Sequence, residues 1–115
     1  MLGKNIKVML SLVLVLSTFL GGLGQLLFKL SMLNLHAELV FFVYLALGVI
    51  AYVTSTAFYF YALSKAQLSW VYSFGGLSYI FATIFAVFIL NEVISPLRAI
   101  GILVIVVGVG VIGAS

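Results

Sequence analysis

Charged residues and proline are scarce in this 115-residue chain, and cysteine is absent. Only 6% of its residues are charged, whereas soluble domains carry about 25%, so it has too few ionised groups to cover a water-facing surface. The absence of cysteine excludes disulfides, thiolate nucleophiles and cysteine metal sites. With one histidine and two acids, neither a catalytic set of nucleophile, base and acid nor a typical metal cluster can be assembled. We therefore expect a protein that is not an enzyme and that needs no cofactor or metal.

Apolar sequence dominates instead, with 66% hydrophobic residues and a mean hydropathy of +1.45. A membrane-spanning helix needs about 20 predominantly apolar residues, and the chain contains four such blocks. We expect helices at about residues 6–33, 39–63, 68–90 and 97–113. These runs are far longer than the roughly ten residues of an outer-membrane barrel strand, and they do not alternate. The sequence predicts an all-α membrane protein, a single domain over residues 1–115 whose four transmembrane helices run up-down-up-down with short loops.

The few basic residues indicate how the helices are oriented. Lys4, Lys7 and Lys65 fall at one end of the predicted bundle, whereas Arg98 falls at the other, together with Lys29 if its side chain snorkels outward. Since lysine and arginine gather on the cytoplasmic side, we expect both termini in the cytoplasm, in a prokaryotic plasma (inner) membrane. The bias is small, so insertion in both orientations stays open. The net charge of +3 is too small and too scattered to predict nucleic-acid binding.

Lys29 and Gln25 are the most unusual polar residues of the first helix. They are four residues apart, so both project from one helix face. Lys29 lies about 6 Å, or one turn, from the outer end of that helix. An ammonium and a neutral amide suit hydrogen bonding to an anionic headgroup, so both are candidate substrate-binding residues. Snorkelling of the lysine toward the headgroups is the equally weighted alternative.

Glycines mark further candidate positions. Gly21, in the first helix, either packs against a neighbouring helix or opens space for a substrate. Gly75 and Gly76 interrupt the middle of the third helix, where a double glycine predicts a kink or hinge. Gly101 and Gly108 are seven residues apart on one face of the fourth helix, which predicts a helix–helix contact between subunits.

Aromatic and hydroxyl side chains follow the second and third helices. We predict that five of them contribute to the wall of a substrate cavity, namely Tyr52, Tyr59, Trp70, Tyr72 and Ser78. The alternative is an interfacial aromatic belt with ordinary packing, together with hydroxyls that bond to carbonyls of their own helix.

Two segments carry a family resemblance. They are Gly24-Gln25-Leu26-Leu27-Phe28-Lys29-Leu30-Ser31 in the first helix and Asn91-Glu92-Val93-Ile94-Ser95-Pro96 before the glycine-rich fourth helix. With its four short-looped helices, the chain resembles the drug/metabolite transporter superfamily over essentially its whole length. Longer members contain two such units inserted oppositely, so the resemblance implies an antiparallel dimer. The partner would be a second copy of the chain or a related four-helix protein.

Two four-helix groups of that superfamily are similar to the chain. The small multidrug resistance family depends on a glutamate three residues before the glycine matched by Gly24, but this chain has Gly21 there and no acid in the first helix. The other group consists of the small flippase subunits for aminoarabinose linked to undecaprenyl phosphate. The chain is similar to them in Gly24-Gln25, Lys29, Leu77-Ser78 and Glu92-x-x-Ser95-Pro96. That resemblance implies a polyprenyl-phosphate-linked sugar, or another anionic lipid, as substrate, with Lys29 as a phosphate contact.

Three functional hypotheses result. The leading one is a membrane transporter or lipid flippase that moves an amphipathic anionic substrate as a dimer. One alternative is a small-metabolite or cationic drug exporter of the small multidrug resistance type. The other is a non-transporting membrane scaffold subunit held by the glycines of its fourth helix. The expected partners are membrane lipid and a small-molecule or lipid-linked substrate, with no nucleic acid.

Overall fold

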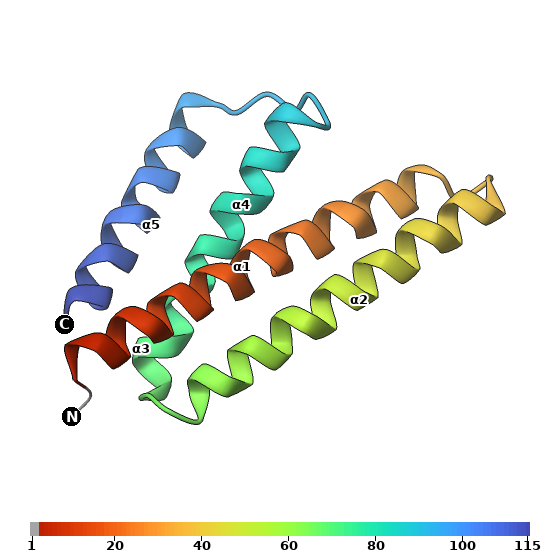
Figure 1. Cartoon of the computed structure of the whole chain (residues 1–115). Coiled ribbons are helices and arrows are strands. Elements are labelled where there is room, and N and C mark those ends of the chain that lie inside the picture. Colours follow the sequence, from red (N-terminus) through yellow and green to blue (C-terminus); the bar gives the residue numbers. More distant parts are fainter. Residues whose placement is uncertain (1–2) are drawn as a thin grey trace.

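The computed structural model describes residues 3–115, and the elements within that range are all helices (Figure 1). Their bounds are Lys4–Leu33 for α1, Glu38–Leu63 for α2, Leu68–Ser73 for α3, Gly75–Phe88 for α4 and Pro96–Ala114 for α5. Since α3 and α4 form one span, four segments are long and apolar enough to cross a membrane. The prediction of an all-α protein with four transmembrane helices is confirmed, and the predicted bounds agree with the observed ones within two residues.

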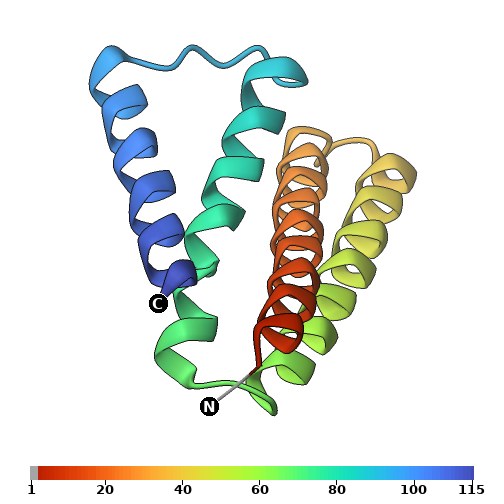
Figure 2. The same cartoon turned by 60° about the vertical axis from the view of Figure 1, so that its left-hand side comes forward.

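Successive spans reverse direction, as the short connections require. Figure 2 shows the start of α1, the end of α5 and the α2–α3 connection at one end of the bundle, which we call the terminal end, and the other two connections at the far end. Both views place α1 between α2 and α4, with α5 on the outer side of α4 (Figures 1 and 2). The first helix is therefore the central one.

Small residues let α1 approach its neighbours closely. A methyl group on Gly24 would meet the Gly48 carbonyl oxygen of α2 at 3.3 Å, and one on Gly22 would meet the Phe81 Cβ of α4 at 2.9 Å. Next to the second contact, the Phe19 ring packs edge-on against Phe81 at a centroid distance of 5.4 Å. Because lipid tails provide no hydrophobic drive between helices, close packing of this kind holds a membrane bundle together.

Most of the buried apolar side chains lie toward the terminal end. The cluster consists of Leu10, Leu14, Ala62, Trp70, Val71 and Phe74. The α4 and α5 helices contain no buried residue, and large apolar side chains cover the outside of the bundle. An apolar exterior of this kind matches hydrocarbon rather than water as the surrounding solvent.

The third span is broken at Phe74, where a continuous helix over residues 68–90 was predicted. The Phe74 N–H donates to the Val71 carbonyl at 3.2 Å, and the Leu77 N–H donates to the Phe74 carbonyl at 2.9 Å. Both bonds reach three residues back, as in a 3₁₀ turn, so the backbone tightens at this point. The buried Phe74 side chain belongs to the core cluster, and the flexible Gly75-Gly76 pair follows directly. The break thus lies beside the predicted kink, whereas hinge motion there stays a prediction.

The α4–α5 connection contains two local signals. Asn91 has a φ of 58°, in the left-handed region that asparagine tolerates better than most residues. Ser95 caps α5, since its Oγ accepts from the Arg98 N–H at 3.2 Å, and Pro96 occupies the first turn. The fourth span, predicted at about residues 97–113, therefore begins at Pro96 with Ser95 as its cap.

Candidate functional site

A groove of about 400 Å³ lies between α1, α2 and the broken third span. Its lining combines hydroxyl, amide and aromatic groups with few aliphatic ones. The residues are Leu14, Ser17, Thr18, Gly21, Gln25, Tyr52, Ser55, Thr56, Tyr59, Phe60, Val71, Tyr72, Phe74, Gly75 and Ser78. None of these side chains is an acid or a base at neutral pH. The groove is therefore uncharged, with polar groups set in a mainly apolar surface.

Most of the residues predicted to bind substrate come together in this groove. Those that line it are Gly21, Gln25, Tyr52, Tyr59, Tyr72 and Ser78, together with the predicted hinge residue Gly75. Lys29 and Trp70 are not among its lining residues. Polar side chains from three different spans thus lie on one surface.

Hydroxyl groups along one wall of the groove tie the helices to each other. Ser17 Oγ donates to the Ser55 carbonyl at 2.8 Å, and Ser55 Oγ donates to the Ser17 carbonyl at 2.6 Å. Ser78 Oγ, on α4, donates to the Thr18 carbonyl at 3.3 Å. These hydroxyls join α1 to α2 and α4, so their hydrogen-bonding capacity is largely used within the protein. The interhelical bonds of Ser17 and Ser55 were not anticipated, because the sequence does not show which backbone carbonyl a hydroxyl meets.

Gly21 lies between two of these hydroxyls. A methyl group at this position would approach Ser55 Oγ to 3.2 Å and Ser78 Oγ to 3.3 Å. The glycine therefore does both things that the sequence left open, since it permits close helix approach and borders the groove. A larger side chain here would occupy groove space and crowd the interhelical hydrogen bonds.

Gln25 and the tyrosines supply the polar groups of the groove that the helix contacts leave unused. Among residues 3–115, the Gln25 amide and the hydroxyls of Tyr52, Tyr59 and Tyr72 form no hydrogen bond. The Gln25 side chain is exposed on α1. These groups can accept from or donate to a molecule that enters the groove.

Lys29 lies outside the lining of the groove. It follows Gln25 by four residues on α1, about 6 Å along the helix axis toward the far end, and its side chain is exposed. This position suits both a contact to the charged end of a substrate and snorkelling to the headgroups.

The predicted hinge and subunit-contact glycines have different surroundings. A methyl group on Gly76 would meet Ile105 Cγ2 of α5 at 2.9 Å, whereas one on Gly75 would have no atom within 4 Å. Gly101 and Gly108 also border open space. Gly76 therefore packs against α5 within the chain. Gly101 and Gly108 instead leave an open strip on α5, which no other described residue fills.

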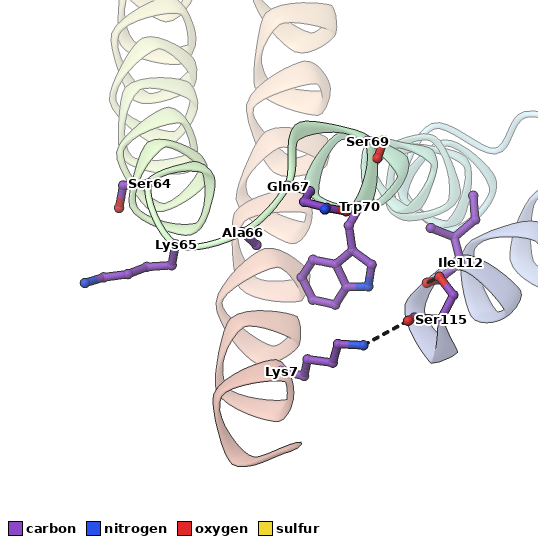
Figure 3. A pocket seen from close by; sticks show the side chains of 9 residues that line it. All are labelled: Lys7, Ser64, Lys65, Ala66, Gln67, Ser69, Trp70, Ile112 and Ser115. Atoms are coloured by element: carbon purple, nitrogen blue, oxygen red, sulfur yellow. Dashed lines mark hydrogen bonds between the residues drawn. The ribbon is translucent and has the colours of Figure 1, made fainter. Parts of the chain in front are cut away.

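A second cavity, of about 770 Å³, lies at the terminal end and contains Trp70 (Figure 3). Its lining residues are Lys7, Ser64, Lys65, Ala66, Gln67, Ser69, Trp70, Ile112 and Ser115. Trp70 was predicted to share a substrate wall with Tyr72, but it faces this second cavity instead. The sequence signal for the cavity was the set of basic residues near the helix ends, from which only the topology was predicted.

Comparison of the chain with known protein families, with curated proteins and with solved structures finds no match. The groove, the charges around it and the resemblance of the two sequence segments are therefore the observations on which a function can be based.

Proposed function

We propose that this small multi-pass membrane protein is a transporter or lipid flippase subunit of the drug/metabolite transporter type. In this proposal the groove between α1, α2 and the third span receives the polar part of an amphipathic anionic substrate. A polyprenyl-phosphate-linked sugar is the substrate class that the resemblance favours. Its lipid tail would remain in the bilayer beside the apolar helix surfaces.

The observation that carries the proposal is the unused hydrogen-bonding capacity of Gln25 and the groove tyrosines. An amide moved into an apolar medium without a partner costs roughly 2 kcal/mol or more. Gln25 lies on a helix otherwise rich in leucine, at a position where lipid tails are the alternative neighbours. A polar substrate in the groove would provide hydrogen-bond partners for the amide. A helix face with only a structural role has no need of such an amide.

The distribution of charge favours an anionic substrate. The groove contains no carboxylate that would balance a cation. Both acids of the chain, Glu38 and Glu92, lie at or beside helix ends, Glu38 as the first residue of α2 and Glu92 in the α4–α5 connection. Lys29 supplies a positive charge one turn beyond Gln25. A phosphate near Lys29 with its neutral sugar at Gln25 fits this arrangement.

Dimer formation is part of the proposal, because four helices are few to enclose a pathway. The groove is bordered by three spans, and α5, with no buried residue, leaves Gly101 and Gly108 open toward a partner helix. The same open strip is what a non-transporting scaffold subunit would use, so this alternative is retained. The cationic exporter is kept as an alternative as well, because the aromatic rings of the groove tyrosines can attract cations.

Native mass spectrometry of the purified protein in a maltoside detergent tests the proposal. We expect retention of an undecaprenyl phosphate probe and weakening on the order of tenfold in Gln25→Leu, because a hydrogen bond to a charged group is lost. Thr54→Val is the matched control, since the Thr54 hydroxyl bonds to its own helix at Ile50 and lies outside the groove lining. Retention of tetraphenylphosphonium alone would contradict the proposal and favour the exporter. Retention of neither probe would favour the scaffold.

A further inference from the structure

The cavity at the terminal end lies in the most basic region of the molecule. Lys4, Lys7 and Lys65 are at this end, where no acid lies among the described residues, and two of these lysines line the cavity. The other four charged residues of the chain, Lys29, Arg98, Glu38 and Glu92, lie toward the far end, where two positive and two negative charges cancel. The net charge of +3 therefore comes from the terminal end alone.

Trp70 presents an unused donor in this cavity. The side chain is 7% exposed, and its Nε1 is a buried polar atom without a hydrogen-bond partner among residues 3–115. Buried tryptophan N–H groups usually have an acceptor, because an unsatisfied donor costs roughly 1–3 kcal/mol. This donor can therefore bond to an acceptor from outside the chain.

Lys7 lines the same cavity as that donor. Its ammonium donates to the main-chain oxygen of Ser115 at 3.0 Å, and Figure 3 shows the indole N–H edge turned toward the same two residues. An ammonium carries three donors, so Lys7 retains capacity beyond this bond. Lys65 extends away from the indole in Figure 3, with its ammonium 6.0 Å from the centre of the Tyr61 ring. This long, exposed contact is weak, so the side chain is available for a stronger anionic partner.

We propose that this cavity binds the phosphate of an anionic lipid headgroup. The Trp70 N–H and the Lys7 ammonium donate to phosphate oxygens, and Lys65 turns toward the phosphate from the α2–α3 connection. Binding exchanges the bond between Lys7 and the Ser115 main-chain oxygen for one to the phosphate, which frees space beside the indole N–H. Charge-assisted bonds of this kind are about twice as strong as neutral ones.

The position of the cavity favours a lipid over a free anion. It lies where α1 begins and α2 ends, so it meets the headgroup layer when these helices span the bilayer. Tryptophan is enriched at that level because its ring is apolar and its N–H is polar. Exposed apolar side chains of α5, among them Val107 and Val111, lie on the same helix as Ile112 of the cavity and would contact the acyl chains. This site is separate from the groove, and its assignment does not depend on the proposed transport function.

Trp70 is the single tryptophan of the chain, so its own fluorescence reports on the site. Protein in a maltoside detergent, which carries no phosphate, is titrated with dioctanoyl phosphatidic acid. We expect a saturable change in Trp70 emission, no change with dioctanoylglycerol, and a weaker response with dioctanoyl phosphatidylcholine, whose choline is repelled by the lysines. Inorganic phosphate at the same concentrations should leave the emission unchanged. An equal response to inorganic phosphate or to dioctanoylglycerol would overturn the lipid-phosphate assignment.

Two variants make the test specific to the named donors. Lys7→Gln should weaken phosphatidic acid binding on the order of tenfold, since one charge-assisted bond is lost. Lys4→Gln is the matched control, because Lys4 is on the same helix but does not line the cavity. Trp70→Phe keeps an aromatic ring and removes only the N–H donor, and its binding is measured by native mass spectrometry with the same lipid. Binding by Trp70→Phe and Lys7→Gln equal to that of Lys4→Gln, with all three proteins folded by circular dichroism, would refute the proposal.

Discussion

Ser17 and Ser55 bind each other's backbone across the interface between α1 and α2. Each Oγ donates to the carbonyl of the other residue, at 2.8 and 2.6 Å, and the two Oγ atoms are 3.2 Å apart. This reciprocal pair fixes both the rotation and the axial register of the two helices at the level of the groove. Gly21 lies next to the pair and leaves the space that both hydroxyls require.

The Ser17–Ser55 pair should contribute measurably to stability. We expect each of Ser17→Ala and Ser55→Ala to lower the free energy of unfolding by about 1 kcal/mol, with a coupling of about 0.6–1.7 kcal/mol in the double mutant. The measurement is reversible unfolding in mixed micelles, followed by circular dichroism. Thr54→Val serves as the control, because the Thr54 hydroxyl bonds within its own helix. Strict additivity of the two serine substitutions would show that the reciprocal bonds are not a unit.

Gly22 should tolerate no side chain, in contrast to Gly101. A methyl group at position 22 would meet Phe81 Cβ at 2.9 Å and the backbone nitrogen of Ala82 at 3.2 Å, and neither atom can move without shifting α4. We expect Gly22→Ala to destabilise the protein by about 1–3 kcal/mol through overpacking. Gly101→Ala meets open space and should raise helix stability by up to about 1 kcal/mol. Thermal unfolding in detergent compares the two, and equal melting temperatures would contradict the α1–α4 packing.

Gly101→Ala and Gly108→Ala also test the predicted subunit contact. If α5 pairs with a partner through these glycines, a methyl group should weaken the dimer while the isolated chain stays folded. Cross-linking in membranes and the mass of the detergent-solubilised particle are the measurements. A dimer population unchanged in the double variant would place the contact elsewhere.

Gly75 and Gly76 should respond differently to the same substitution. Gly75→Ala adds a methyl group in open space, so it should leave stability unchanged or improved and reduce backbone freedom at the break beside Phe74. Gly76→Ala would approach Ile105 Cγ2 to 2.9 Å and Val109 Cγ2 to 3.2 Å, so it should displace α5 and lower stability by about 1 kcal/mol. Transbilayer movement of a fluorescent polyprenyl phosphate in proteoliposomes, measured beside melting temperature, separates the effects. Full activity of Gly75→Ala would argue against a hinge there.

The contribution of Lys29 to substrate binding should be separable from that of Gln25 by two substitutions at position 29. If Lys29 contacts a substrate phosphate, Lys29→Ala should weaken binding on the order of tenfold, and Lys29→Arg should retain most of it because the charge is kept. Binding of undecaprenyl phosphate is measured by native mass spectrometry, with particle size as the folding control. Equal binding by both variants and the parent protein would show that the ammonium only snorkels.

The spans could be predicted from sequence because their signal is local. A run of about 20 apolar residues specifies a membrane helix wherever it lies in the chain, and Ser95-Pro96 specifies a helix start through its own cap. The double glycine marked the region of the break in the third span, although the helix actually ends at Ser73 and restarts at Gly75 after the buried Phe74. Length, number and alternating direction of the helices follow from these signals.

The rotation of each helix was decided only by the tertiary structure. Helices that are apolar on every side carry little hydrophobic pattern from which to tell an inner face from an outer one. Gln25 therefore shares a face with Lys29 in the sequence, yet only Gln25 lines the groove, and Trp70 belongs to a different cavity from Tyr72. The faces were selected by close approach at Gly22 and Gly24 and by hydroxyl bonds to distant carbonyls, which exist only once the helices are packed.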